Sequence, residues 1–420
     1  MHQKIRLSFW KRAAAFLLTG VTVSGFVACS SDSKPESSQT IVEETEMVAE
    51  PTLFDTYVSN TVIATGNNTI IKSADSVTYR AWLPVEVSGE FDYCFYFSNT
   101  VDSTYDDGFV SYVGMSGGSY TIESASISDG GTEFDANIDP ETTVSITFLG
   151  ETSKEVLPDE TFWSDPVSFD VPEGHYLLWE WTISGENIPA ICMSNLAYSY
   201  KDKGDDKGFL YTNEIPLPQL IGVDRKVEAR IVTLGDSVTQ GCQTTEFEQD
   251  FWAAQTLEQL GTDSYSLWNL GLGYSRATDC ATDGDWLERA IAGADIVTIA
   301  FGTNDIISGA YGEGGSSSAE EIETAVRTIT NACTSAGIQT ILWNSPPFDL
   351  TEELDAIRTE YNARVETIAE DYGAVYFDVA SLLADESNAS KTVYGQHPDG
   401  EGGTVIVNAL TPVIQSLMES

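Results

Sequence analysis

Three residues in the C-terminal half of the chain carry side chains suited to acyl transfer. Ser237 follows an apolar run in IVTLGDSVTQG, Asn304 lies in AFGTNDI, and His397 lies in YGQHPDGEGG. A serine hydroxyl attacks an ester only when a base takes its proton and donors stabilise the oxyanion. His397 can act as that base, and the Ser237 N–H and the Asn304 amide can act as donors. The three residues therefore predict a serine-dependent site.

The choice of His397 as the base rests on elimination. Of the three histidines, one lies in the N-terminal leader, and His175 lies in VPEGHYLLW, which is typical of a turn between strands. His397 precedes Pro398 and a glycine-rich stretch, which predicts a tight loop that presents the imidazole. The neighbouring acids Asp236 and Asp305 are expected to brace loops and to do no chemistry.

The elements that must position these residues form an α/β pattern after about residue 223. Apolar runs typical of buried parallel strands alternate with helical patterns, which predicts a doubly wound, flavodoxin-like five-stranded parallel sheet over residues 223–420. In that strand order the first and third strands are neighbours, so Ser237 and Asn304 should face one crevice. The expected strands are 229–234, 265–270, 295–301, 338–343 and 374–378, and the expected helices are 246–260, 284–293, 317–336, 352–372 and 402–418.

Residues 53–222 differ from the C-terminal part in composition and in the pattern of their apolar residues. Segments such as SVTYRAWLPVEV and HYLLWEWTIS are rich in β-branched and aromatic residues and are broken by turn residues, which predicts an all-β sandwich domain. Most aromatics at strand spacing belong to a core, but four tryptophans could instead form a platform for sugar rings: Trp82, Trp163, Trp179 and Trp181.

The N-terminus reads as a targeting segment. Residues 1–28 combine a basic start with an apolar core that ends in FVAC, at Cys29. This arrangement resembles a bacterial lipoprotein signal peptide, which implies a lipid anchor on Cys29 and a location on the extracellular face of a bacterial membrane. Residues 29–52 are polar and acidic, and predict a flexible tether. Without the anchor the protein would be secreted.

The charge and the cysteine content limit the partners. The chain has 20 Lys and Arg residues against 65 Asp and Glu residues, a net charge of −45. Such a field repels nucleic acid and phospholipid headgroups and favours neutral substrates. Six Cys without a CxxC pair and three His predict no metal site, and the serine chemistry needs no cofactor. Cys242 and Cys280, each after one of the motifs below, could lie close enough for a disulfide.

Four motifs together resemble the SGNH, or GDSL-type, hydrolases. GDSVTQG, NLGLG, GTND and HP occur in the order of that family's blocks I, II, III and V, over residues 230–403. The resemblance implies that Ser237 is the nucleophile and an oxyanion donor, that a glycine of block II and Asn304 are further donors, and that His397 is the base. More loosely, residues 53–222 resemble the β-sandwich that precedes the hydrolase domain in many secreted bacterial SGNH esterases.

Two positions depart from the family pattern. Tyr274 stands where the glycine donor is expected, so the donor is either Gly273, which we favour, or Gly271. Tyr394 stands where the triad Asp is expected, three residues before the His, and a phenol cannot balance an imidazolium at neutral pH. His397 is then oriented by a backbone carbonyl or by a nearby acid. Asp399 is the closest acid in the sequence, and Asp385 and Glu386 are more distant candidates.

The sequence therefore predicts an extracellular serine esterase that removes small O-acyl groups, most simply acetyl, from a neutral polysaccharide or oligosaccharide through an acyl-enzyme on Ser237. Membrane contact is expected only through the lipid anchor. Two alternatives stay open at this point. The chain could be a carbohydrate-binding protein whose hydrolase site has decayed, and Tyr394 in place of the triad Asp would be the first sign of that loss. It could also be an O-acyltransferase that uses the same residues.

Overall fold

The computed structural model describes residues 52–419, except 107–108, 135–137, 193–195, 283 and 312–315. The expected signal segment, Cys29 and nearly all of the tether lie outside the described residues. None of the helices found in the described ranges is both long and apolar enough to cross a membrane.

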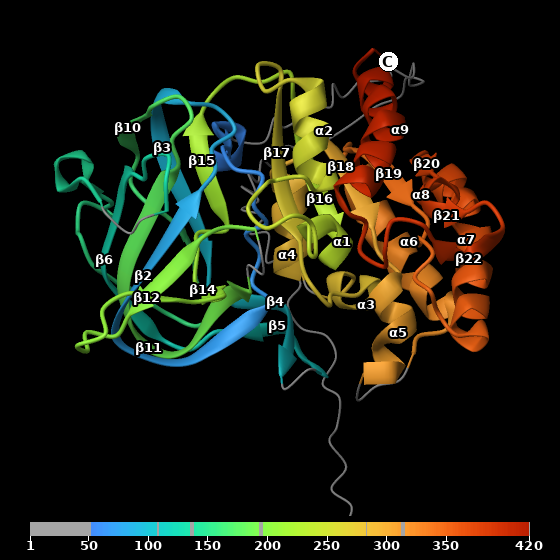
Figure 1. The fold of residues 1–420 in the computed structure, drawn as a ribbon, viewed down its shortest axis with the longest axis horizontal. Helices are drawn as coiled ribbons and strands as arrows, with labels where there is room; N and C mark the ends of the chain where they lie inside the picture. The colour runs from blue at the N-terminus through green and yellow to red at the C-terminus, as the bar shows by residue number, and fades with distance from the viewer. Residues whose placement is uncertain are drawn as a thin grey trace, which may run out of the picture. The chain divides into compact units, whose positions relative to one another are not determined.

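The first part of the described chain, residues 53–224, is here called the β-rich region. Two sheets with antiparallel pairing make up most of it, as Figure 1 shows in blue and green. The first sheet runs β1 (Tyr57–Ser59), β15 (Leu220–Asp224), β3 (Gly89–Ser98) and β10 (Val167–Val171), with β9 (Thr161–Trp163) also on β3. The second runs β13 (Leu210–Tyr211), β12 (Ser199–Asp202), β2 (Thr69–Leu83), β11 (Leu177–Cys192), β6 (Tyr120–Asp129) and β7 (Val144–Ser145), with β14 (Glu214–Ile215) on β11 and β8 (Lys154–Val156) on β6.

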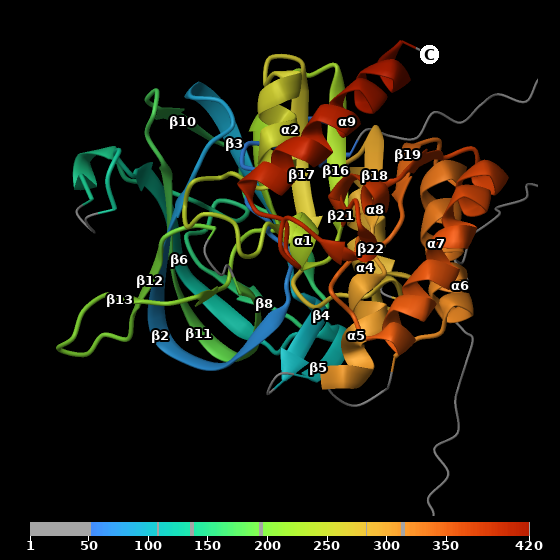
Figure 2. The ribbon, with the colours of Figure 1, turned by 45° about the vertical axis from the view of Figure 1, so that its right-hand side comes forward.

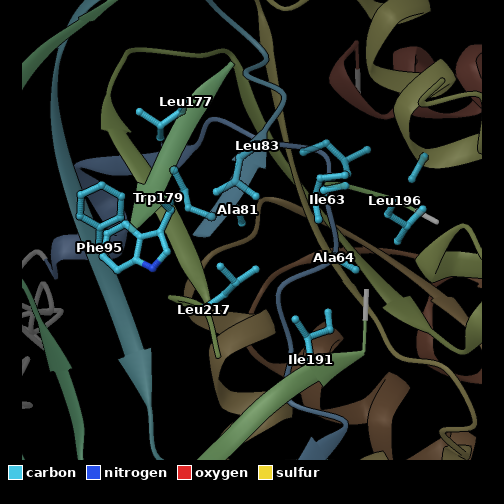
Figure 3. Packing of buried hydrophobic residues seen from close by; sticks show 14 of the residues in the cluster. Ile63, Ala64, Ala81, Leu83, Phe95, Leu177, Trp179, Ile191, Leu196 and Leu217 are labelled. Carbon is cyan, nitrogen blue, oxygen red and sulfur yellow. The ribbon is translucent and has the colours of Figure 1, made fainter. Parts of the chain in front are cut away.

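The two sheets bury aromatic side chains between them. Phe95 on β3 meets Trp179 on β11, with ring centroids 4.8 Å apart, and Figure 3 shows the pair among the aliphatic residues of the core. Phe97 and Trp181, two residues further along the same strands, repeat the contact at 5.7 Å. Because side chains two apart on a strand share a face, this alternation fixes which face of each sheet turns inward. A separate hairpin joins β4 (Thr100–Asp106) to β5 (Phe109–Ser116).

The rest of the chain, residues 229–419, is here called the α/β region. Its five-stranded sheet has the order β17-β16-β18-β19-β20, and all pairs are parallel. This order is the flavodoxin-like order expected from the sequence, with the first strand between the second and third. The strands are β16 (Ala229–Gly235), β17 (Tyr265–Gly271), β18 (Ile296–Ala300), β19 (Gln339–Trp343) and β20 (Val375–Phe377).

Helices cover both faces of this sheet. One face packs against α2 (Trp252–Leu260) and α9 (Gly400–Met418), which lie beside each other in Figures 1 and 2. The other face packs against α4 (Gly284–Ala292), α6 (Ala319–Ser335) and α7 (Glu352–Tyr372). The remaining elements are α1 (Ser237–Gln240), α3 (Ala277–Cys280), α5 (Thr303–Tyr311), α8 (Val379–Leu383), the pair β21 (Ala384–Asp385) and β22 (Asn388–Thr392), and two 3₁₀ turns, Leu53–Asp55 and Pro140–Thr142.

Local signals explain most helix ends. The Ser318 hydroxyl accepts the N–H of Glu321 and the Glu321 carboxylate accepts the N–H of Ser318, a capping box that starts α6. The expected helix 246–260 is shorter than predicted and begins at Trp252. Phe247 and Gln249 have φ of +65° and +57°, which a right-handed helix cannot contain.

Polar contacts join the two regions. The guanidinium of Arg289 on α4 donates to the Asp102 carboxylate of β4 at 2.7 Å, and both side chains are almost fully buried. Asp285, which also accepts from Arg289, accepts from Ser98 at 2.7 Å. The expected boundary between residues 222 and 223 falls inside β15. Cys242 and Cys280 form no disulfide with each other, so that prediction is wrong.

Candidate active site

The chain between β16 and α1 turns sharply and places Ser237 at the carboxyl end of the central strand. Asp236 caps α1, with its carboxylate accepting the N–H of Val238 at 2.9 Å. A Cβ on Gly235 would lie 2.7 Å from the Ala300 carbonyl, so only glycine lets β16 end this close to β18. Ser237 thus begins a short helix beside the ends of the two neighbouring strands, the position where ligands bind in such sheets.

The structure brings His397 to Ser237. The Ser237 Oγ and the His397 Nε2 lie 2.8 Å apart, hydrogen-bond distance, although 160 residues separate them in the chain. The imidazole comes from the loop between β22 and α9 and packs edge-on against the ring of Phe348, with centroids 5.6 Å apart. This is the contact that a nucleophile and its general base require.

The other imidazole nitrogen, Nδ1, points into the protein interior. His397 Nδ1 is buried and accepts or donates no hydrogen bond within the described part of the chain. Asp399 instead caps α9, with its carboxylate accepting the N–H of Gly402 at 2.9 Å. Neither of the two partners left open for Nδ1 by the sequence is found among the described residues. No backbone carbonyl accepts from Nδ1, and the carboxylate of Asp399, the alternative, caps the helix. Burial lowers the pKa of His397 below its ordinary value of 6.5.

Asn304, the expected side-chain oxyanion donor, lies beyond the carboxyl end of β18, the strand next to β16. It is the second residue of α5 and is 7% exposed. Its Nδ2 donates one hydrogen to the Ser275 carbonyl at 3.0 Å, which holds the amide in place and leaves the second hydrogen for a ligand. Ser237 is the first residue of α1, so its N–H has no partner inside the helix.

The glycines of the second motif are engaged differently from the prediction. The Gly273 N–H donates to the Gln240 Oε1 at 2.7 Å, and the Gly271 N–H donates to the Asn269 Oδ1 at 2.9 Å. Both candidate N–H groups therefore already have a buried acceptor, and neither is presented to an oxyanion in this arrangement. Tyr274 holds the position of the family's glycine with φ of +71°, a conformation that favours glycine.

Asp236 and Asp305, the two acids beside the motifs, accept hydrogen bonds from backbone N–H groups of the adjacent segments, as predicted. Asp305 accepts the N–H groups of Ala277 and Thr278 at 2.8 and 3.1 Å, which fixes α3 against α5. Burial raises the pKa of Asp236 to about 7 and that of Asp305 to about 6.

Over the residues that the structure covers, no group of three or more His, Cys, Asp or Glu side chains is arranged to hold a metal ion.

Other sequence candidates lie elsewhere. Trp82, Trp179 and Trp181 are each at most 2% exposed, so they belong to the core and cannot form a sugar platform. Trp163 is half-buried and packs against Phe54. His175 lies in the β-rich region, where its Nδ1 is 2.7 Å from an Asp129 carboxylate oxygen.

Two residues that support the site were not singled out from the sequence. Gln240 is the sixth residue of the first motif, GDSVTQG, and its side chain reaches Gly273 and the β-rich region. Asn269 begins the second motif, and its Nδ2 donates to the Thr239 carbonyl at 3.0 Å. Both amides are almost fully buried. Their places within the two motifs are the one signal in the sequence that could have identified them.

The chain was compared with known proteins and with solved structures. No curated protein matches the chain. Among solved structures, a GDSL-like lipase from Bacteroides thetaiotaomicron is 17% identical over 45% of this chain and 89% of its own, with a TM-score of 0.36. The acetyl xylan esterase AlAXEase is 19% identical over 44% and 99%, with a TM-score of 0.37. A variant of an acetyl-xylooligosaccharide esterase from Geobacillus is 18% identical over 45% and 94%, with a TM-score of 0.37.

The family comparison covers the motifs described above. Residues 233–404 match the model of the GDSL-like Lipase/Acylhydrolase family. This range runs from β16, just before Ser237, into α9, just after His397. The C-terminal region of this chain therefore contains a domain of the GDSL-like lipase/acylhydrolase family.

Proposed function

We propose that this protein is a serine esterase that removes small O-acyl groups from carbohydrate. The observation that carries the proposal is the 2.8 Å contact between the Ser237 hydroxyl and His397 Nε2 at the carboxyl end of the parallel sheet. A serine and a histidine in this arrangement form the minimal pair for acyl transfer, with Asn304 and the Ser237 N–H as donors.

The reaction runs through an acyl-enzyme. His397 Nε2 takes the proton of Ser237 as the Oγ attacks the acyl carbon, and the carbonyl oxygen becomes an oxyanion held by the Ser237 N–H and the Asn304 amide. The intermediate collapses, and the sugar hydroxyl leaves with the proton from His397. Water then attacks the acyl carbon and gives its proton to His397, and the second collapse releases the carboxylic acid and restores Ser237.

The net charge of the chain and the exposed ring of Tyr274 support this substrate class. The chain carries a net charge of −45, so anionic substrates such as phospholipids are repelled and a neutral acylated sugar is not. The side chain of Tyr274 is 52% exposed between Gly273 and Ser275, whose backbone groups bond to Gln240 and Asn304. This ring is a surface against which a sugar can pack.

The location belongs to the same proposal. Residues 1–52 supply a lipoprotein-type signal, the anchor Cys29 and a tether, so the enzyme works on the outer side of a bacterial membrane. Cys29→Ala should release the protein from the membrane fraction or block its processing. Unchanged attachment with normal processing would contradict the anchor.

The deciding experiment compares the wild type with Ser237→Ala. A serine-reactive phosphonate should label the wild type once, at Ser237, and should not label the variant. The wild type should release acetate from acetylated xylan and hydrolyse 4-nitrophenyl acetate, and Ser237→Ala should do neither. Transfer of acetyl to an added oligosaccharide in preference to water would indicate an acyltransferase. A protein that binds xylan but shows no labelling and no turnover would indicate a decayed site.

A further inference from the structure

Gln240 lies on α1, the helix that begins with Ser237, and contacts the β-rich region. It is the last residue of α1, three residues after Ser237, and is 1% exposed. Its Oε1 accepts the N–H of Gly273 at 2.7 Å and lies 3.3 Å from the Cys242 Sγ. Its Nε2 donates to the Cys192 carbonyl at 2.9 Å. One buried amide thus ties α1 to the loop after β17 and to the end of β11.

The partner on the β-rich side is itself held firmly. Cys192 is the last residue of β11, and its N–H donates to the Asn68 Oδ1 at 2.7 Å. Asn68 is fixed in turn, because its own N–H donates to the Ala190 carbonyl at 2.9 Å. The Asn68 Nδ2 lies only 3.6 Å from the place where a Cβ on Gly273 would stand. Two residues of the β-rich region therefore converge on Gln240 and Gly273.

The Gly273 loop is connected to the catalytic donors. Two residues after Gly273, the Ser275 carbonyl accepts from the Asn304 Nδ2 and the Ser275 hydroxyl donates to the Gly235 carbonyl at 3.1 Å. A displacement of the loop would therefore move Asn304 relative to Ser237. Misplacement of a catalytic group by about 1 Å can cost on the order of 100-fold in rate.

We propose that Gln240 is a positioning residue through which the β-rich region sets the spacing between Ser237 and the oxyanion donors. The inference rests on the esterase function proposed above. It gives the β-rich region a part in catalysis that does not depend on sugar binding. The contrasting view is that Gln240 Oε1 only competes with the oxyanion for the Gly273 N–H, and in that case removing the amide would accelerate the reaction.

The test uses Gln240→Met, which keeps the length of the side chain and removes its hydrogen bonds to Gly273, Cys192 and Cys242. The matched control is Gln249→Met. The Gln249 Nε2 also donates to a carbonyl of the β-rich region, that of Leu196 at 2.9 Å, but no hydrogen bond joins its side chain to Gly273. Measurements on the full chain are kcat and KM for 4-nitrophenyl acetate, the rate of phosphonate labelling, and the unfolding temperature.

Gln240→Met should lower kcat and the labelling rate by at least about tenfold and change KM by less than about twofold. Gln249→Met should keep kcat within about twofold of the wild type, with a similar loss of unfolding temperature. Equal kcat effects in the two variants, or a faster Gln240→Met, would overturn the proposal. If Gln240→Met does not fold, Asn68→Ala decides, with an expected kcat loss of at least about fivefold and refutation if kcat is unchanged.

Failure of the two proposals can be told apart. A wild type that is labelled at Ser237 but hydrolyses no ester would refute the esterase function, and the labelling rates of the variants would still test Gln240. A wild type that the phosphonate does not label would refute both proposals.

Discussion

His397 touches Ser237 through Nε2 at 2.8 Å, while its Nδ1 is buried without a hydrogen-bond partner among the described residues. The carboxylate that follows it most closely, Asp399, is bonded to the first turn of α9. The imidazole is therefore held by packing, including the edge contact with Phe348, and not by an acid. A base without a charged partner should differ measurably from a complete triad.

The first prediction separates the base His397 from Asp399, the acid nearest to it in sequence. His397→Ala should lower kcat by at least about 1,000-fold, because no other group takes the Ser237 proton. Asp399→Ala should keep kcat/KM within about threefold but lower the free energy of unfolding by about 1 kcal/mol, because α9 loses its N-cap. Asp399→Asn, which preserves the cap, should change neither. Esterase kinetics and urea unfolding provide the measurements. A thousandfold loss in Asp399→Asn would restore the triad.

The second prediction concerns the pH dependence of the rate. Burial lowers the pKa of His397 from 6.5, and only the neutral imidazole can accept the Ser237 proton. The active form therefore persists to lower pH than for an ordinary histidine. The acid limb of kcat/KM for 4-nitrophenyl acetate should have its midpoint below about 6.5. A midpoint above that value would mean that Nδ1 has an anionic partner in the free enzyme.

The third prediction uses the buried acid next to the nucleophile. Burial raises the pKa of Asp236 to about 7, above its value of 3.8 in the unfolded chain. The folded state binds this proton more tightly, so the stabilisation is complete below about pH 4 and is lost as the pH rises through about 7. Between pH 5 and 8 the unfolding temperature of the wild type should fall by about 2 °C more than that of Asp236→Asn. Parallel curves for the two proteins would contradict the assignment. The asparagine variant is the matched control, because its Oδ1 can still accept the Val238 N–H.

The fourth prediction tests the exposed ring beside the site. Tyr274 has φ of +71°, so glycine is the replacement that removes the ring without straining the loop. Tyr274→Gly should raise KM for an acetylated xylooligosaccharide by at least about fivefold and leave kcat/KM for 4-nitrophenyl acetate within about threefold. Tyr274→Phe should retain the wild-type KM for the sugar ester. An equal effect on both substrates would mean that the residue shapes the site and does not contact sugar.

The sequence predicted the parallel sheet well because each strand is a buried apolar run. The expected segment 338–343 agrees closely with β19, and the segment 265–270 with β17. Amphipathic helices with explicit caps, such as α6 and α7, were equally clear. The four-residue helices α1 and α3 were not predicted, because such short segments have no periodic pattern and are fixed by tertiary contacts.

The site was predictable only as far as its motifs reach. The sequence identifies Ser237, Asn304 and His397 by their residue types and by their places after predicted strands or in a tight loop. It does not identify the hydrogen-bond partner of each backbone N–H group in the site. The hydrogen bond from the Gly273 N–H to the Gln240 side chain joins two motifs that are distant in sequence. The spacing of residues within either motif therefore does not predict it. Asp399 remained an open alternative because of its closeness in sequence to His397. Its position just before a helix is a capping signal, which decides where its carboxylate points.

The buried contact between Arg289 and Asp102 limits how this gene can evolve. A guanidinium enclosed at the junction needs its carboxylate, since removal of one partner from a buried ion pair costs about 3–5 kcal/mol. Recombination that replaced the N-terminal half with that of a relative would have to bring an acid to the place of Asp102, or change Arg289 at the same time. A chimera that met neither condition would bury Arg289 without the carboxylate of Asp102 and would be less stable.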